Sequence, residues 1–322
     1  MHRLRHLLQR QDGLVARRQA VETGLGDSDL RRLLRRRELV PALPGVYVDH
    51  TGPLTWSQRA WAGVLFAGPD RAGAKPTDRA ALCAQSALRA WEGAESRHHD
   101  DAGPIHVAVD RDRRARAPAQ VVVHRLAGLE EKAQWNVGPP RLRLEEAVVD
   151  VAATAPDELS AVGTLTAAIN SRRTTPDRVA AALADRTRIA RRAFLASVLD
   201  DLEQGTCSVL EHGYLHRVER AHALPPGRRQ AAAHARGRIY RDVLYEQFAQ
   251  VVELDGRLDH ARAEARDRDL ERDLETTLDG LSTVRLGWGQ VFVRPCLTAA
   301  RVGALLQRAG WTGRPRRCPQ CP

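Results

Sequence analysis

The spacing of hydrophobic residues near the N-terminus predicts two short helices joined by a turn. The first helix covers Ala16 to Glu22, and the turn covers Thr23 to Gly26. The second helix begins with Asp27 or Ser28 as its cap and has leucines at the i, i+3, i+4 spacing of one face. The run Leu39 to Val48 is broken by prolines and ends in β-branched residues, so we expect a β-hairpin wing there.

The second of these helices has a basic face opposite its leucines. A basic helix that follows a glycine turn and precedes a wing is typical of winged helix-turn-helix modules, which place such a helix in the major groove of DNA. Two interpretations remain open, DNA contact or a solvated helix whose leucines pack on the neighbouring domain, because charge alone does not specify a sequence. The candidate DNA-binding residues are Arg31, Arg32, Arg35 and Arg36.

The middle of the chain, from Thr55 to about Thr154, has mixed helix and strand patterns and no constellation of catalytic residues. Its arginine-rich stretch Asp110 to Ala117 is interpreted as the solvated tip of a hairpin. We expect helices around Ser57 to Phe66 and Ala80 to Trp91, strands at Ile105 to Val109 and Val121 to Leu126, and a strand passing into a helix over Arg141 to Ala153.

The segment from Glu158 to about Glu203 has helical spacing with a break at Pro176, and we interpret it as a helical connector. A length of 322 residues favours more than one domain. The expected division is a winged helix-turn-helix over 1–54, an α/β middle domain over 55–155, the connector over 156–205, a nuclease-like domain over 206–312 and a basic tail over 313–322.

After Ser208 the pattern alternates between helical spacing and strand alternation. The order is helix, three-strand meander, helix, strand, helix, which packs as one mixed sheet with helices on both faces. The fold class expected for the whole chain is therefore α/β (α+β). The segments are Ser208 to Ala223, Gln230 to Ala235, Ile239 to Tyr245, Ala249 to Leu254, Ala261 to Leu278, Ser282 to Trp288 and Leu297 to Ala309.

Three acidic residues interrupt the apolar strands of this meander. Asp242 lies on the second strand and Glu253 on the third, where alternation and pairing let both carboxylates reach one face. Asp255 shares the face of Glu253 and adds a third oxygen ligand. Clustered carboxylates suit Mg²⁺ or Mn²⁺, which can clamp a phosphodiester and activate water. The alternative is a structural ion network with Arg241, Arg257 or Arg285.

The residues around these acids resemble a known family. Tyr240-Arg241-Asp242 and Val252-Glu253-Leu254-Asp255-Gly256, followed by His260, are similar to the domain of unknown function related to very-short-patch repair (Vsr-like) endonucleases, in the PD-(D/E)XK restriction-endonuclease-like superfamily. The resemblance implies magnesium ligands at Asp242 and Glu253, a supporting Asp255, a helper acid at Glu211, and His260 as an aid to the water or leaving group.

Two features depart from that family pattern. The superfamily lysine two positions after the Glu is Asp255 here, and no lysine follows Lys132 in the chain. Glu211 also has a structural explanation, because Ser208-Val209-Leu210-Glu211 matches the Ser-x-x-Glu capping box of a helix start.

The N-terminal run Arg17 to Val48 resembles, more loosely, the winged-helix part of AbiEi-type antitoxins of type IV toxin–antitoxin systems. The resemblance implies operator binding, and it makes a cognate toxin-like protein a candidate partner.

The net charge of +10 favours a polyanionic partner such as DNA. Only Lys75 and Lys132 are lysines, and a GC-rich genome also produces such an arginine bias, so the charge supports nucleic acid only where arginines cluster. No apolar run approaches the ~18 residues of a membrane span, and no secretory signal follows the basic first residues. We therefore expect a cytoplasmic protein without a membrane partner.

The five cysteines, Cys83, Cys207, Cys296, Cys318 and Cys321, are scattered and predict reduced thiols. The tail carries one Cys-x-x-Cys, whereas structural zinc usually needs four ligands. A zinc site that borrows Cys296 or a histidine is the alternative, but we expect a frayed basic tail without zinc.

Together these patterns predict a DNA-binding protein with a magnesium-dependent DNA endonuclease domain of Vsr-like type. The arginines of the N-terminal helix and those of the turn at Arg236 and Arg238 would contact phosphates. The alternative is a non-catalytic, antitoxin-like transcriptional regulator with a degenerate nuclease fold, and a third option is a partner-binding surface in a toxin–antitoxin pair.

Overall fold

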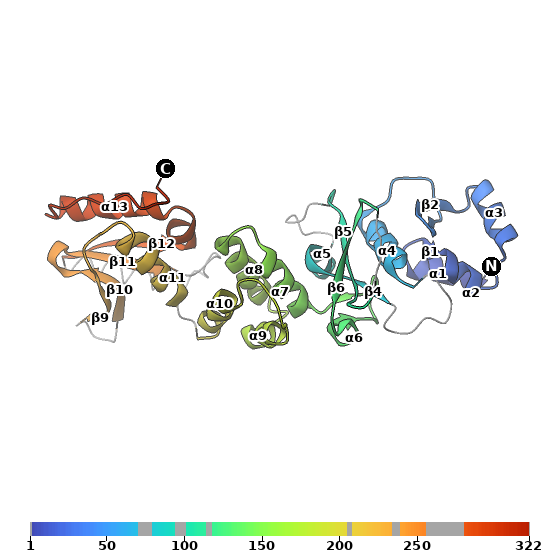
Figure 1. Cartoon of the computed structure of the whole chain (residues 1–322), viewed down its shortest axis with the longest axis horizontal. Helices are drawn as coiled ribbons and strands as arrows, with labels where there is room; N and C mark the ends of the chain where they lie inside the picture. The colour runs from blue at the N-terminus through green and yellow to red at the C-terminus, as the bar shows by residue number, and fades with distance from the viewer. Residues whose placement is uncertain are drawn as a thin grey trace. The chain divides into compact units, whose positions relative to one another are not determined.

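The chain has a mixed α/β fold, as predicted, and it divides into two compact units, Met1–Val151 and Ala152–Pro322 (Figure 1). The described residues form three sheets, with three and five strands in the first unit and four in the second. The computed structural model describes residues 2–69, 79–93, 101–113, 118–204, 208–233, 239–255 and 280–321.

The first unit begins with three helices and a small sheet. The two predicted helices and the predicted β-hairpin are present, and the sequence patterns missed the helix and strand that precede them. Strand order is β1-β3-β2, and buried Leu4, Val15 and Leu30 belong to one core between the helices and the sheet. The elements are α1 (His2–Arg10), β1 (Leu14–Ala16), α2 (Arg17–Glu22), α3 (Asp27–Arg35), β2 (Val40–Leu43) and β3 (Val46–Val48).

The turn before α3 sets where that helix starts. Gly24 has a φ of +94°, a backbone conformation that residues with a Cβ rarely adopt. Gly26 is the N-cap residue, and its N–H donates to Asp29 Oδ2 at 3.2 Å. The cap therefore precedes the predicted cap, which was Asp27 or Ser28. Asp27 and Asp29 lie in the first turn, where their negative charge interacts favourably with the positive end of the helix dipole.

The five-stranded sheet of the first unit has the order β6-β5-β4-β8-β7. Two predictions for this region were wrong. Ala80–Leu82 is a strand rather than the start of a helix, and β5 and β6 pair in parallel, which excludes a hairpin between them. The elements are α4 (Trp56–Ala67), β4 (Ala80–Leu82), α5 (Ala84–Glu92), β5 (Ile105–Asp110), β6 (Val121–Leu126), α6 (Leu129–Lys132), β7 (Ala133–Gln134), β8 (Arg141–Leu142) and α7 (Leu144–Thr154).

Three helices open the second unit: α8 (Glu158–Asn170), α9 (Pro176–Ala184) and α10 (Arg192–Gln204). Asp157 Oδ1 accepts the N–H of Ser160 at 2.7 Å and caps α8. Pro176 stands in the first turn of α9, where its missing N–H costs no hydrogen bond. The predicted helical content of this segment and the break before Pro176 are confirmed.

The remainder of the second unit is one mixed sheet with helices before and after it. Strands β9, β10 and β11 form the predicted antiparallel meander, and β12 pairs in parallel with β11. The helix predicted over Ala261 to Leu278 lies outside the described residues. The elements are α11 (Ser208–Gly213), the π-helix η2 (Tyr214–Arg220), β9 (Arg228–Ala233), β10 (Ile239–Tyr245), the 3-10 helix η3 (Glu246–Phe248), β11 (Gln250–Asp255), β12 (Ser282–Gly287), the π-helix η4 (Gly289–Val293) and α13 (Pro295–Arg308).

The π-helix η2 before the sheet packs tightly on the π-helix η4 after it. A Cβ added at Gly213, where α11 passes into η2, would stand 2.6 Å from the Phe292 ring of η4. Phe292 stacks on Trp288, and Arg217 lies 4.9 Å from the centre of its ring. These interactions fix η2 against η4, and α13 also packs on η2. None of the described helices is long and apolar enough to cross a membrane.

Candidate functional site

The two acids predicted as principal metal ligands lie on neighbouring strands. Val243 of β10 is opposite Val252 of β11, and Asp242 and Glu253 are the next residue of each strand beyond this pair. Asp242 Oδ2 also accepts the N–H of Leu254 at 2.6 Å, which holds this carboxylate against β11.

The other predicted residues of this site are placed less completely. Asp255, two residues after Glu253 on β11, is half-buried as Glu253 is. Glu211 is half-buried on α11, and its capping role depends on the Ser208 side chain, which lies outside the described residues. His260 also lies outside them. Asp201 Oδ2 accepts the N–H of Val209 at 2.7 Å, so the start of α11 has a cap from another helix.

Of the arginines in the alternative ion network, Arg285 lies within the described residues. Arg285 of β12 is the register partner of Glu253 on the parallel neighbour strand. Arg257 and the side chain of Arg241 lie outside the described residues. Both interpretations of the acids, metal ligands and ion network, therefore remain.

The predicted basic face of α3 is exposed to solvent. Leu30 and Leu33 are buried beneath the helix, whereas Arg31, Arg32, Arg35 and Arg36 are exposed. Arg32 pairs with Asp29 of the same helix at 3.1 Å. Arg236 and Arg238, the other predicted phosphate contacts, lie outside the described residues.

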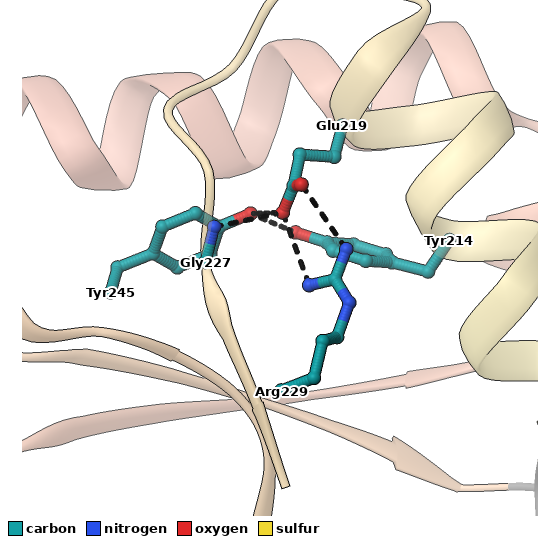
Figure 2. A network of polar contacts seen from close by, with 5 residues as sticks. All are labelled: Tyr214, Glu219, Gly227, Arg229 and Tyr245. Carbon is teal, nitrogen blue, oxygen red and sulfur yellow. Dashed lines mark hydrogen bonds and ion pairs between the residues drawn. The ribbon is translucent and has the colours of Figure 1, made fainter. Parts of the chain in front are cut away.

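A buried polar network that sequence reasoning missed lies where η2 meets the meander (Figure 2). Both carboxylate oxygens of Glu219 accept from the Arg229 guanidinium, at 3.1 and 3.2 Å. Glu219 Oε2 also accepts from the Tyr245 hydroxyl at 3.0 Å and the Gly227 N–H at 3.2 Å. The Tyr214 and Tyr245 hydroxyls are 2.9 Å apart.

This network balances the buried charge of Glu219. Glu219 is only 4% exposed, and its charge is balanced by Arg229 and by neutral donors. Burial raises the pKa of both Tyr214 and Tyr245 far above the ordinary value, so the phenols stay protonated and serve as donors. The network joins η2 to β9 and β10.

A second group that brings distant residues together lies at the end of η2. Among the described residues, His222, Cys296, Cys318 and Cys321 form the group of three or more side chains that could hold a metal ion, with ligand atoms within 4.8 Å of one another. The three predicted carboxylates do not form such a group there. Burial, with hydrogen bonds to Cys321 and Cys318, raises the pKa of the Cys296 thiol to about 12.

The tail that carries two of these cysteines is seated on the second unit. The N–H of Arg316 donates to the His222 carbonyl at 2.8 Å. A Cβ at Gly303 of α13 would clash with the ring of Pro315. The expected frayed tail is therefore wrong for these residues, because backbone pairing and close packing hold them against η2 and α13.

Sequence reasoning missed His222 as a member of this group. The Cys-x-x-Cys tail and Cys296 gave a partial signal. His222, however, is separated from Cys296 by all four strands of the sheet, and from the tail by α13 as well. Only the packing of α13 on η2 brings the histidine to the cysteines.

Comparisons with known proteins add little. No family model matches the chain, and no curated protein matches it. A crystal structure of the Rv2827c protein from Mycobacterium tuberculosis is similar at 20% sequence identity and a TM-score of 0.38, over 64% of this chain and 81% of that one. We draw neither fold nor function from a likeness of this size.

Proposed function

We propose that the chain is a DNA-binding protein whose C-terminal unit hydrolyses DNA with Mg²⁺ or Mn²⁺. The observation that carries the proposal is that β10 and β11 pair with Val243 opposite Val252, and Asp242 and Glu253 are the next residue of each strand. Carboxylates next to buried Val243, Val252 and Leu254 are costly unless a cation or a donor balances them.

The donor set fits magnesium better than a softer metal. All candidate ligands are carboxylate oxygens, which Mg²⁺ prefers. Magnesium keeps several waters and is commonly bound through one or two carboxylates and the phosphates of a substrate. A pair such as Asp242 and Glu253 suits that mode without a closed protein cage.

The sheet order supports the same proposal. The antiparallel meander and the fourth strand, with α11 before the sheet and α13 after it, follow the order of elements predicted from the sequence pattern.

Each residue of this site has a proposed role. Asp242 and Glu253 would hold the cation, with Asp255 beside them. A bound magnesium supplies electrostatic stabilisation of the phosphate and a water of lowered pKa. The hydrogen bond from the Leu254 N–H fixes the rotamer of Asp242 before any cation binds. His260 is proposed to assist the water or the leaving group.

The N-terminal unit would bring DNA to this site. Its order of helices and strands, with the β2–β3 hairpin after α3, supports a winged helix-turn-helix. The exposed arginines of α3 stand on the helix that such modules insert in the major groove. DNA is thus the proposed partner of both units.

Plasmid cleavage tests the proposal. We expect wild-type protein with Mg²⁺ or Mn²⁺ to nick or linearise plasmid DNA, and Asp242→Asn and Glu253→Gln to lose that activity at least about a hundredfold. Glu246→Gln is the matched control, because Glu246 is an exposed acid of the same unit that pairs with Arg228 at 2.5 Å. Equal inactivity of all four proteins would contradict the nuclease proposal.

A second candidate function is a non-catalytic regulator that binds an operator. Asp255 favours it, because an acid stands where the nuclease superfamily has a lysine. DNA binding that persists in protein without cleavage would support the regulator. Capture of a toxin-like protein encoded beside the chain would add the antitoxin role.

A further inference from the structure

Four side chains from three parts of the second unit converge beside η2. His222 follows this π-helix, Cys296 is the second residue of α13, and Cys318 and Cys321 belong to the tail. We propose that these residues bind one structural zinc ion through three thiolates and the imidazole. The proposal is independent of the carboxylate site and of any nuclease activity.

The separations between the ligand atoms fit a zinc tetrahedron. Zinc–sulfur bonds of about 2.3 Å and zinc–nitrogen bonds of about 2.0–2.1 Å place tetrahedral ligands about 3.8 Å apart for two sulfurs and about 3.5–3.6 Å for sulfur and nitrogen. Cys318 Sγ lies 3.6 Å from Cys296 Sγ and 3.8 Å from Cys321 Sγ. Cys321 Sγ lies 3.6 Å from His222 Nε2.

The histidine is oriented as a metal ligand requires. Its Nδ1 lies 3.0 Å from the Val218 carbonyl, which can only accept, so Nδ1 carries the proton. In this tautomer the lone pair belongs to Nε2, which lies on the side of Cys321. Such a second hydrogen bond fixes the tautomer and ring direction of zinc-bound histidines. His222 is only 2% exposed, so this orientation is fixed before a metal arrives.

The Cys-x-x-Cys turn is closed by its own backbone. The Cys321 N–H donates to the Cys318 carbonyl at 3.0 Å, and the Cys318 N–H lies 3.3 Å from Cys321 Sγ. These two contacts accompany the 3.8 Å approach of the Cys318 and Cys321 sulfurs.

A disulfide does not explain the same group. A disulfide bond is about 2.05 Å long and joins two sulfurs, whereas Cys318 Sγ stands at nearly equal, longer distances from two others. It would also leave the third thiol and the histidine without a role. Four protein ligands complete a tetrahedron and leave no position for water, so the site is structural and not catalytic.

The proposed zinc would join the tail to the rest of the unit. It links the end of η2, the first turn of α13 and the last residues of the chain. A bound metal that requires the folded arrangement adds its binding free energy to the stability of that arrangement.

Metal analysis of the full chain tests the proposal. Protein produced in zinc-supplemented medium and desalted is expected to hold about one zinc ion per chain by plasma mass spectrometry. Replacement by Co²⁺ is expected to give the intense visible bands of a tetrahedral thiolate site. Cys321→Ala is expected to lose the metal and the bands, while Cys83→Ala, which removes a buried thiol of the first unit, keeps both.

His222→Cys guards against variants that fail to fold, because a four-cysteine site still binds zinc and Co²⁺ with a changed spectrum. Wild-type protein without zinc, which also takes up no Co²⁺ when its thiols are reduced, would overturn the proposal. A Cys321→Ala protein that retains full zinc would also overturn it. So would wild-type protein that, before any reduction, holds no metal and has two fewer free thiols than expected, because two of the cysteines would then form a disulfide.

Discussion

At the scale of single residues, Glu219 shows how this unit balances a buried charge. Its carboxylate accepts from Arg229, Tyr245 and the Gly227 backbone (Figure 2). Removal of one partner from a buried ion pair leaves the other charge uncompensated, which costs far more than an exposed pair contributes.

We therefore expect Glu219→Gln to lower the free energy of unfolding by about 3–5 kcal/mol. Urea unfolding followed by circular dichroism measures this loss. Glu246→Gln is the control, because its pair with Arg228 is exposed and contributes at most about 1 kcal/mol. Equal losses in the two variants would show that burial of the Glu219 network contributes nothing.

The histidine pair His106 and His124 makes the first unit sensitive to acid. The rings stack 5.2 Å apart, with His106 Nδ1 2.9 Å from His124 Nε2. Burial lowers the pKa of both, and the neighbouring His124 lowers that of His106 further. In the unfolded chain the rings keep a pKa near 6.5, so below about pH 6.5 the unfolded state binds more protons.

Stability of the first unit is therefore expected to fall as the pH drops from about 7.5 to 5. His106→Gln should flatten this dependence, whereas His6→Asn, which alters an exposed histidine of α1, should leave it unchanged. Urea unfolding at several pH values measures the slope. A slope that is identical in wild type and His106→Gln would contradict the account.

At the scale of elements, α3 is the helix on which the DNA-binding proposal depends. It buries leucines and presents arginines, and the β2–β3 hairpin follows it. Arg31→Glu with Arg35→Glu is expected to weaken DNA binding on every sequence and to lower the salt slope of log K by about 2. Fluorescence anisotropy at several salt concentrations measures both quantities.

Arg172→Glu with Arg188→Glu gives a control of equal charge change, at exposed positions of the second unit. If this pair weakens binding as much as the α3 pair, net charge and not the α3 face determines affinity.

The elements of the second unit were predictable because apolar spacing changes clearly from helix to strand. The strand-like runs that contain Val243 and Val251 predict β10 and β11, and pairing confirms both strands. Helix α1 escaped prediction because its leucines sit among arginines and histidines, and β1 is only three residues long. The parallel pairing of β5 and β6 depends on distant interactions that local periodicity does not reveal.

The candidate sites divide in the same way. The location of Asp242 and Glu253 on neighbouring strands could be predicted from the sequence, because each lies in its own strand-like run. The group around His222 could not, because its members come from a helix end, a second helix and a tail whose meeting depends on tertiary packing. Spacing rules find ligands that are close in sequence, and this group has only one such pair.

At the scale of the whole molecule, two compact units are proposed to divide the work (Figure 1). The first would bind DNA, and the second would cut it. Within the second unit, oxygen ligands at Asp242 and Glu253 suit a hard cation, whereas sulfur and nitrogen ligands around His222 suit zinc. The two metals should therefore load independently.

The most direct test of the proposed function is calorimetric titration of Mg²⁺ into zinc-loaded protein. We predict one magnesium site in wild type and in Glu246→Gln, and its loss in Glu253→Gln. Zinc content measured on the same samples shows whether each variant is folded around His222. Absence of magnesium binding in wild type, or equal binding in wild type and Glu253→Gln, would contradict the central claim.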